Sequence, residues 1–148
     1  MNYMPALVQL PLVRDPGTRK IRTPEDALLA CADVAALAQE SFHVLTIDSK
    51  NNLINRHMVS LGTVDSSAVH AREVFRAAVL DSASAVVVVH NHPSGDPSPS
   101  AEDVRITRQL VEAGRVMGIQ IMDHVIVGRH ADGKPSRLSL RETGVCDF

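Results

Sequence analysis

Two histidines and an aspartate near the middle of the chain have the residue types and spacing of a metal site. His90 and His92 are separated by one residue, so in an extended segment their imidazoles project to the same side of the backbone. Asp103 follows across a proline-rich loop, within reach of the same point. Three such ligands leave the fourth position of a tetrahedral zinc ion for water, as in catalytic zinc sites. Because water bound there has a pKa of about 7, the pattern predicts a hydrolytic centre.

Helix capping offers a second explanation for part of this pattern. Ser100 and Asp103 have the spacing of a capping box, in which the two residues satisfy backbone N–H groups at the start of a helix. Capping alone gives no reason for the two histidines or for the rigid loop before Ser100. The two explanations are compatible, because a cap that fixes where the helix begins also fixes the direction of Asp103.

The elements that would position these residues follow from hydrophobic periodicity and turn residues. Segment 84–89 is apolar on both faces, as in a central strand covered on both sides. In chain order, the sequence predicts a helix over 23–39, a hairpin of strands over 42–48 and 53–60, a loop over 62–67, a helix over 71–80, a strand over 84–89, a loop over 90–99, a helix over 100–117, and strands over 119–128 and 136–140. This order predicts one α/β domain, a mixed sheet flanked by helices, with the site at the carboxyl end of the central strand.

Composition limits the class of protein. The chain has 148 residues, about one domain's worth. Its 45% hydrophobic and 22% charged residues are ordinary for a globular protein, and its 3% aromatic content predicts an aliphatic core. The net charge of −2 differs from the basic balance of general nucleic-acid binders, so nucleic acid is not an expected partner.

The expected location is the cytoplasm. Cys31 and Cys146 are far apart and form no CxxC pair, which fits a reducing compartment. The apolar run 85–89 is much shorter than the ~20 residues of a membrane span. The stretch 1–17 lacks the basic start of a signal peptide.

The motif loop resembles that of a known family. His90-x-His92, seven residues, Ser100, two residues and Asp103 make the JAMM signature of MPN-type metalloproteases. Within that group, HNHPSGDPSPSAED followed by MDHVIVG is similar to the RadC family of bacterial proteins. The resemblance covers about 23–128 and implies a JAB/MPN domain of the cytidine-deaminase-like fold, with one zinc ion per chain held by His90, His92 and Asp103. It also implies that the Ser100 hydroxyl helps to stabilise the tetrahedral oxyanion.

The same resemblance requires an upstream glutamate as general base. Glu40, in QESFHVLTID just before a predicted strand, matches the position at which MPN proteins carry it. Glu73, in HAREVF, is the alternative. Its neighbours Arg72 and Arg76 favour a surface ion pair, which stabilises a protein little. We therefore expect Glu40 to be the base.

The mixed, proline-containing stretch 1–22 is expected to be an extended N-terminal arm or edge strand, and the RadC-like metal-binding domain is expected over 23–148. Longer family members carry a helix-hairpin-helix region before this domain. Here about 22 residues precede Thr23, so DNA binding attributed to that region is not transferred.

Two functions from different classes follow. The first is a zinc-dependent amide hydrolase, a metalloprotease or isopeptidase-like enzyme whose peptide or protein substrate the sequence does not identify. The second is a non-catalytic MPN-fold binding module, which the family's name links to DNA repair or recombination. A complete ligand set and a base favour the hydrolase, because a scaffold needs no open coordination position. A nuclease is disfavoured, since phosphodiesterases usually use two metals. The exposed edge of such a sheet also favours a homodimer.

Other polar residues near the motif have simpler explanations. His124, in MDHVIVG, could orient a metal ligand, although a half-buried strand histidine is more common, and Asp123 could support a zinc histidine from outside. Asn91, Ser94 and Asp96 are expected to hold the loop through side-chain-to-backbone hydrogen bonds, although Ser94 or Asp96 could also contact substrate. The histidines without partner spacing are expected at the surface or in packing: His43, His57, His70 and His130.

Overall fold

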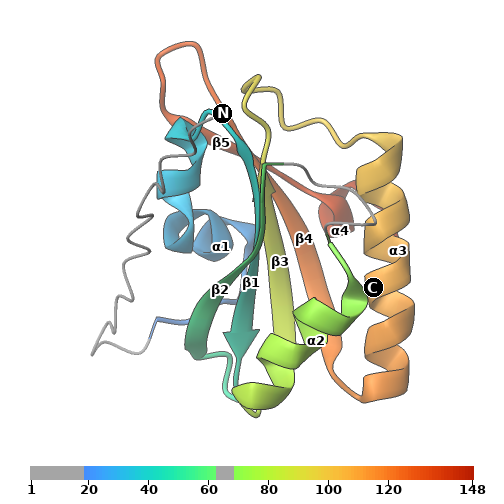
Figure 1. Ribbon diagram of the computed structural model, residues 1–148. Coiled ribbons are helices and arrows are strands. Elements are labelled where there is room, and N and C mark those ends of the chain that lie inside the picture. Colours follow the sequence, from blue (N-terminus) through green and yellow to red (C-terminus); the bar gives the residue numbers. More distant parts are fainter. Residues whose placement is uncertain (1–18, 63–68) are drawn as a thin grey trace, which may run out of the picture.

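In the computed structural model, the described residues 19–62 and 69–148 form one α/β domain (Figure 1). Its elements in chain order are α1 (Pro24–Ala30), the 3-10 helix η1 (Ala32–Ala36), β1 (Glu40–Ile47), β2 (Leu53–Gly62), α2 (Ala71–Leu80), β3 (Ala85–Asn91), α3 (Ala101–Met117), β4 (Gln120–Arg129), β5 (Pro135–Ser139) and α4 (Leu140–Thr143). The strands make one five-stranded sheet of order β2-β1-β3-β4-β5. β3 and β4 are parallel and the other neighbours antiparallel. This confirms the predicted fold, a mixed sheet flanked by helices.

Helices cover the two faces of the sheet (Figure 1). On the face that we call the α3 face, α2 and α3 pack over Val44 and Val88. On the opposite face, the α1 face, α1 and η1 pack over Leu45 and Val89. Because side chains alternate along a strand, neighbouring residues of β1 and β3 belong to opposite cores.

The first helix is shorter than its sequence predicts. Thr23 caps α1 through a capping box with Asp26, which confirms the predicted start. The predicted extension to residue 39 is wrong, because α1 ends at Ala30 and the separate helix η1 follows. A tertiary contact stabilises this end: the Arg56 guanidinium from β2 donates to the Ala30 carbonyl oxygen at 3.2 Å. This hydrogen bond satisfies a carbonyl that the end of the helix leaves without an intrahelical partner.

Two strands extend further toward the motif than predicted. β3 continues beyond residue 89 through His90 and Asn91, which pair with Phe42 of β1 and Val127 of β4. β1 begins at Glu40 rather than at residue 42. Strand pairing on both sides of β3 therefore carries regular structure up to the proline-rich loop, where local sequence predicts a break.

The other elements lie within about two residues of their predicted bounds. The predicted helix 71–80 coincides with α2, and α3 begins directly after its Ser100 cap. The arm up to residue 18 and most of the predicted loop 62–67 lie outside the described residues. Cys31 and Cys146 are both buried and free. No helix in the described part of the chain has the length and apolar character needed to cross a membrane.

Candidate metal centre

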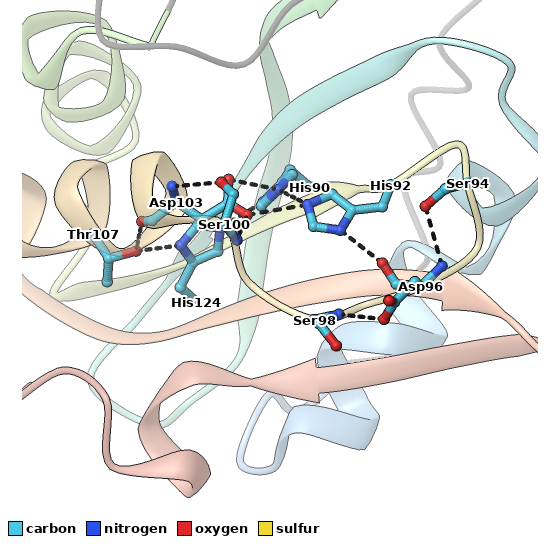
Figure 2. A network of polar contacts seen from close by, with 9 residues as sticks. All are labelled: His90, His92, Ser94, Asp96, Ser98, Ser100, Asp103, Thr107 and His124. Carbon is cyan, nitrogen blue, oxygen red and sulfur yellow. Dashed lines mark hydrogen bonds and ion pairs between the residues drawn. The ribbon is translucent and has the colours of Figure 1, made fainter.

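Three side chains converge at the carboxyl end of β3 (Figure 2). Nε2 of His90 lies 3.0 Å from Nε2 of His92. The Asp103 carboxylate places Oδ1 3.2 Å from the His90 nitrogen and Oδ2 3.1 Å from the His92 nitrogen. The exposed fraction of the His92 side chain is 14%, and the other two side chains are buried. These residues form a cluster that could hold a metal ion.

Two local structures bring the three side chains together. His92 continues the direction of β3, since its N–H donates to the Val127 carbonyl oxygen at 2.9 Å, so its ring lies on the same face as that of His90. Asp103 stands in the first turn of α3. The Ser100 hydroxyl accepts the Asp103 N–H at 3.0 Å, and Asp103 Oδ2 accepts the Ser100 N–H at 2.8 Å. One carboxylate is therefore both part of the capping box and part of the cluster.

A chain of hydrogen bonds fixes the tautomer of His90 (Figure 2). The Thr107 hydroxyl donates to the Asp103 carbonyl oxygen at 2.6 Å, so its oxygen accepts from His124 Nδ1–H, 2.5 Å away. His124 Nε2 then carries a lone pair, to which His90 Nδ1–H donates at 2.7 Å. Burial lowers the pKa of His124 well below its usual value, which keeps this ring neutral. As a result, His90 directs the Nε2 lone pair at His92 and Asp103.

The loop after β3 orients His92 in the same way. His92 Nδ1 lies 2.8 Å from the Asp96 carbonyl oxygen, which can only accept, so Nδ1 carries a proton. The Asp96 carboxylate accepts the Ser98 N–H at 2.9 Å, and the Ser94 hydroxyl accepts the Asp96 N–H at 3.3 Å. Ser94 and Asp96 thus hold the loop through the side-chain-to-backbone bonds that the sequence predicts.

This donor set fits a cation. In neutral rings both Nε2 atoms carry lone pairs, and these face each other at 3.0 Å beside a carboxylate, which is repulsive unless a positive charge lies between them. The hydrogen bond to Asp103 raises the pKa of His92, so the site favours positive charge. Burial alone would raise the pKa of Asp103, but the neighbouring imidazoles of His90 and His92 outweigh it and hold that pKa below its usual value. Two imidazoles and a carboxylate are ligands that zinc accepts.

Close backbone contacts hold the motif loop against the end of β4. The Arg129 N–H donates to the Gly95 carbonyl oxygen at 2.8 Å, and the Arg129 guanidinium donates to that of Pro93 at 2.7 Å. A Cβ at Gly128 would lie 2.1 Å from the Gly95 oxygen, so residue 128 must be glycine for the loop to approach this closely. The loop is anchored along its length, and it leads to α3, whose Asp103 meets the two histidines.

The negative charge of Glu40, at the start of β1, acts on His92. Phe42 pairs with His90 across the antiparallel β1–β3 ladder. Continuing that register by two residues brings Glu40 level with His92, and both then project to the α3 face. After the hydrogen bond to Asp103, the negative charge of Glu40 further raises the pKa of His92.

The alternative glutamate is engaged elsewhere. Glu73 lies on α2, with 45% of its side chain exposed, and forms the predicted ion pairs with Arg72 at 3.6 Å and with Arg76 at 4.0 Å. Two of the histidines set aside from the sequence also have local roles, since His70 caps α2 and His43 is buried in packing.

Residues 21–145 match the family model of the RadC-like JAB domain. The chain belongs to this family. A UPF0758 protein of Caldanaerobacter subterraneus subsp. tengcongensis is 46% identical over 129 residues, which cover 86% of this chain and 53% of that protein. One from Syntrophomonas wolfei is 50% identical over 115 residues, or 74% and 49% of the two chains. One from Listeria welshimeri is 45% identical over 125 residues, or 84% and 54%. The chain thus spans about half the length of the curated relatives it matches.

Sequence reasoning missed or undervalued several supporting residues of this JAB domain. It missed Thr107, although Thr107 follows Asp103 by one helical turn and so shares its face of α3. It favoured a plain strand role for His124, whose signal is a polar residue within an apolar strand. The suggested support of a zinc histidine by Asp123 is wrong. Its carboxylate instead accepts from the Ser139 hydroxyl at 2.6 Å, which joins β4 to the segment before α4.

Proposed function

We propose that this JAB domain is a zinc-dependent amide hydrolase that cleaves a peptide or isopeptide bond. The observation that carries the proposal is the convergence of two imidazole lone pairs and one carboxylate on a single point. The β1–β3 register, extended by two residues past its last pair, would bring Glu40 level with that point. Three protein ligands with an acid–base group beside them are the requirement of a catalytic zinc site, whereas a structural site is closed by four protein ligands.

His90, His92 and Asp103 would hold the zinc ion. When bound, zinc supplies a Lewis acid that lowers the pKa of water and polarises a carbonyl oxygen. The protein keeps its ligands in the form that a metal requires. Hydrogen bonds at Nδ1 aim the Nε2 lone pairs of both histidines, and the lowered pKa of Asp103 keeps its carboxylate ionised.

Glu40 would act as the general base. Its carboxylate takes a proton from the attacking water and later gives a proton to the nitrogen of the leaving amine, so that water and an amide become an acid and an amine. Its position favours this role because its negative charge acts on His92, the candidate ligand that retains solvent exposure.

Ser100 would stabilise the oxygen that becomes negative as the amide carbon turns tetrahedral. The Ser100 oxygen accepts the Asp103 N–H, and a hydroxyl that accepts one hydrogen bond still has its own proton to donate. Loss of one such donor typically costs about 10²–10³-fold in kcat. Ser100→Thr keeps a hydroxyl at the helix cap and serves as the control for Ser100→Ala, which also removes the cap.

The decisive experiment compares Glu40→Gln with Glu73→Gln at equal zinc occupancy, with a library of fluorogenic peptides and isopeptides as the probe. Glutamine is nearly isosteric with glutamate but cannot take a proton. We expect Glu40→Gln to keep its zinc and to lose hydrolysis by about 10²–10⁴-fold, while Glu73→Gln stays active. An inactive Glu73→Gln beside an active Glu40→Gln would reverse the assignment of the base.

The same library separates the hydrolase from a binding module. If the zinc-loaded protein cleaves no member of it, and a bound partner is retained after Asp103→Ala, the hydrolase proposal is wrong. Elemental analysis of the purified protein tests the metal, with zinc as the expected element.

A further inference from the structure

Asn91 lies between the two histidines and faces the other way. Because side chains alternate along β3, the imidazoles of His90 and His92 occupy the α3 face and Asn91 occupies the α1 face. Asn91 is 1% exposed. Its Oδ1 accepts the Ser41 N–H at 2.7 Å and the Ser41 hydroxyl at 2.8 Å, and its Nδ2 donates to the Gln39 carbonyl oxygen at 2.9 Å. All three hydrogen bonds are made to Gln39 and Ser41, the residues on either side of Glu40.

We propose that Asn91 is a positioning residue that holds the start of β1 so that Glu40 stays level with His92. The inference rests on the proposed function, because it gives Glu40 the role of the base. It adds that the strand carrying two ligands also fixes the base, through a side chain on the opposite face of the sheet.

On the β3 side, the backbone ladder does not reach Glu40. The β1–β3 pairing begins at Phe42 and His90 and runs away from the site. Ser41 and Glu40 lie beyond the last pair of this ladder, and on their other side they pair with Leu61 and Gly62 at the end of β2. The Ser41 N–H donates to the Asn91 side chain instead. On the β3 side of β1, the Asn91 side chain therefore takes the place of a backbone partner, next to Glu40.

A directed chain of hydrogen bonds supports Asn91 from behind. Arg56 Nε–H donates to His43 Nδ1 at 3.3 Å, so the neutral ring carries its proton on Nε2 and donates to the Ser41 hydroxyl at 2.8 Å. That hydroxyl then donates to Asn91. Arg56 is itself held by both carboxylate oxygens of Asp33, at 2.6 and 3.0 Å. Each donor in the chain has one acceptor, so the Asn91 amide is locked in orientation.

The test compares Asn91→Ala with Asn55→Ala, an asparagine of β2 that bonds Asp81 at 3.0 Å rather than the start of β1. We expect Asn91→Ala to speed amide hydrogen exchange at Ser41 by about tenfold or more. Its Zn²⁺ dissociation constant, measured by competition with a chromophoric chelator, should stay within about threefold of wild type, because no ligand is touched. Asn55→Ala should leave both quantities unchanged.

Two readouts separate a positioning role from a general structural one. On the peptide library, Asn91→Ala should lower kcat by about tenfold or more with little change in KM, and should have no further effect in the Glu40→Gln background. In the Co²⁺-loaded protein, Asn91→Ala should reproduce the change in visible absorption that Glu40→Gln causes, whether or not a substrate is found.

Two results would overturn the inference. One is an equal loss of kcat from Asn91→Ala in the wild-type and Glu40→Gln backgrounds. The other is a Co²⁺ spectrum that Glu40→Gln changes and Asn91→Ala does not. If Glu40→Gln itself stays active, the assigned base fails first, and the inference fails with it. Should Asn91→Ala not fold, Ser41→Ala removes one of the three bonds to Asn91 and is tested by the same measurements.

Discussion

The two faces of the sheet at the end of β3 carry hydrogen-bonded networks that finish differently. On the α3 face, the chain from Thr107 through His124 ends at His90 with a lone pair that points at another lone pair, that of His92. On the α1 face, the chain from Arg56 ends at Asn91, whose amide oxygen and nitrogen are both engaged. The first network leaves acceptors without donors, and the second matches each donor with an acceptor.

This difference separates binding from support. Acceptors that converge in a buried site repel one another until a proton or a metal ion lies between them. The cluster on the α3 face therefore favours the binding of positive charge. The network on the α1 face, in which each donor has an acceptor, does not favour cation binding and instead makes the structure rigid. Since the two networks meet on consecutive residues of one strand, substitutions on the two faces should change different measurable quantities.

The largest expected effect is loss of metal on the α3 face. Wild-type protein purified without chelators should hold about one zinc per chain, and His92→Ala should lose most of it. Loss of a residue that only supports a ligand lowers metal affinity by about 10–100-fold, so loss of the ligand itself should lower it further. His43→Gln, the matched change on the α1 face, should keep its zinc. Elemental analysis after gel filtration measures both. Full zinc in His92→Ala would refute the division between the faces.

On the α1 face, the expected effect is a loss of folding stability as the pH falls. Burial, followed by the nearby charge of Arg56, lowers the pKa of His43 from 6.5 to about 4. The unfolded chain therefore binds this proton at higher pH than the folded one. The stability from neutral His43 is complete above about pH 6.5 and is lost as the pH falls toward 4, a change of about 3 kcal/mol.

His43→Gln keeps a donor and an acceptor but cannot titrate. Urea unfolding of zinc-free protein at pH 7.5 and pH 4.5 should show a smaller loss of stability in this variant than in wild type. A residual loss is expected, because the pKa of buried His124 is also lowered. An identical loss in both proteins would show that His43 does not contribute.

An intermediate effect is expected at His124, the residue on the α3 face that supports the candidate ligand His90. His124→Leu fills a similar volume but removes the acceptor for His90 Nδ1–H, so the ring loses its fixed tautomer and orientation. Zinc affinity should fall about 10–100-fold, as measured by chelator competition on protein shown to be folded by circular dichroism. Unchanged affinity would mean that the ring of His90 needs no partner.

The smallest effect should come from a carboxylate outside both networks. Glu73→Gln removes exposed ion pairs with Arg72 and Arg76, and such pairs contribute about 0–1 kcal/mol. Zinc content and thermal unfolding should match wild type closely. A loss of zinc in this variant would place Glu73 in the centre.

The convergence of His90, His92 and Asp103 is predictable from the sequence because its signals are local. Alternation brings His90 and His92 to one side, and the Ser100 cap directs Asp103. The supports are harder to predict, because their partners lie far along the chain. Asn91 is expected to bond backbone groups and does, but those of Gln39 and Ser41 rather than of its own loop.

The same reason explains the errors in the fold. The segment after Thr23 is rich in alanine and predicts a long helix, yet the Ala30 carbonyl is taken by Arg56 from β2. His90 and Asn91 precede prolines and predict a loop, yet strands on both sides extend β3 through them. In each case a partner distant in sequence decides the local structure.

The contact between Gly95 and Gly128 limits how this motif could be transplanted. A designer who grafts the histidine pair, the loop and the capped aspartate onto another scaffold would copy one continuous segment of chain. That segment lies against β4, where a Cβ at position 128 would meet the Gly95 oxygen at 2.1 Å. The recipient scaffold therefore needs a glycine, which has no Cβ, at the matching position of an adjacent parallel strand. Without it, the loop would be lifted away and the aspartate would miss the histidines, even with each ligand present.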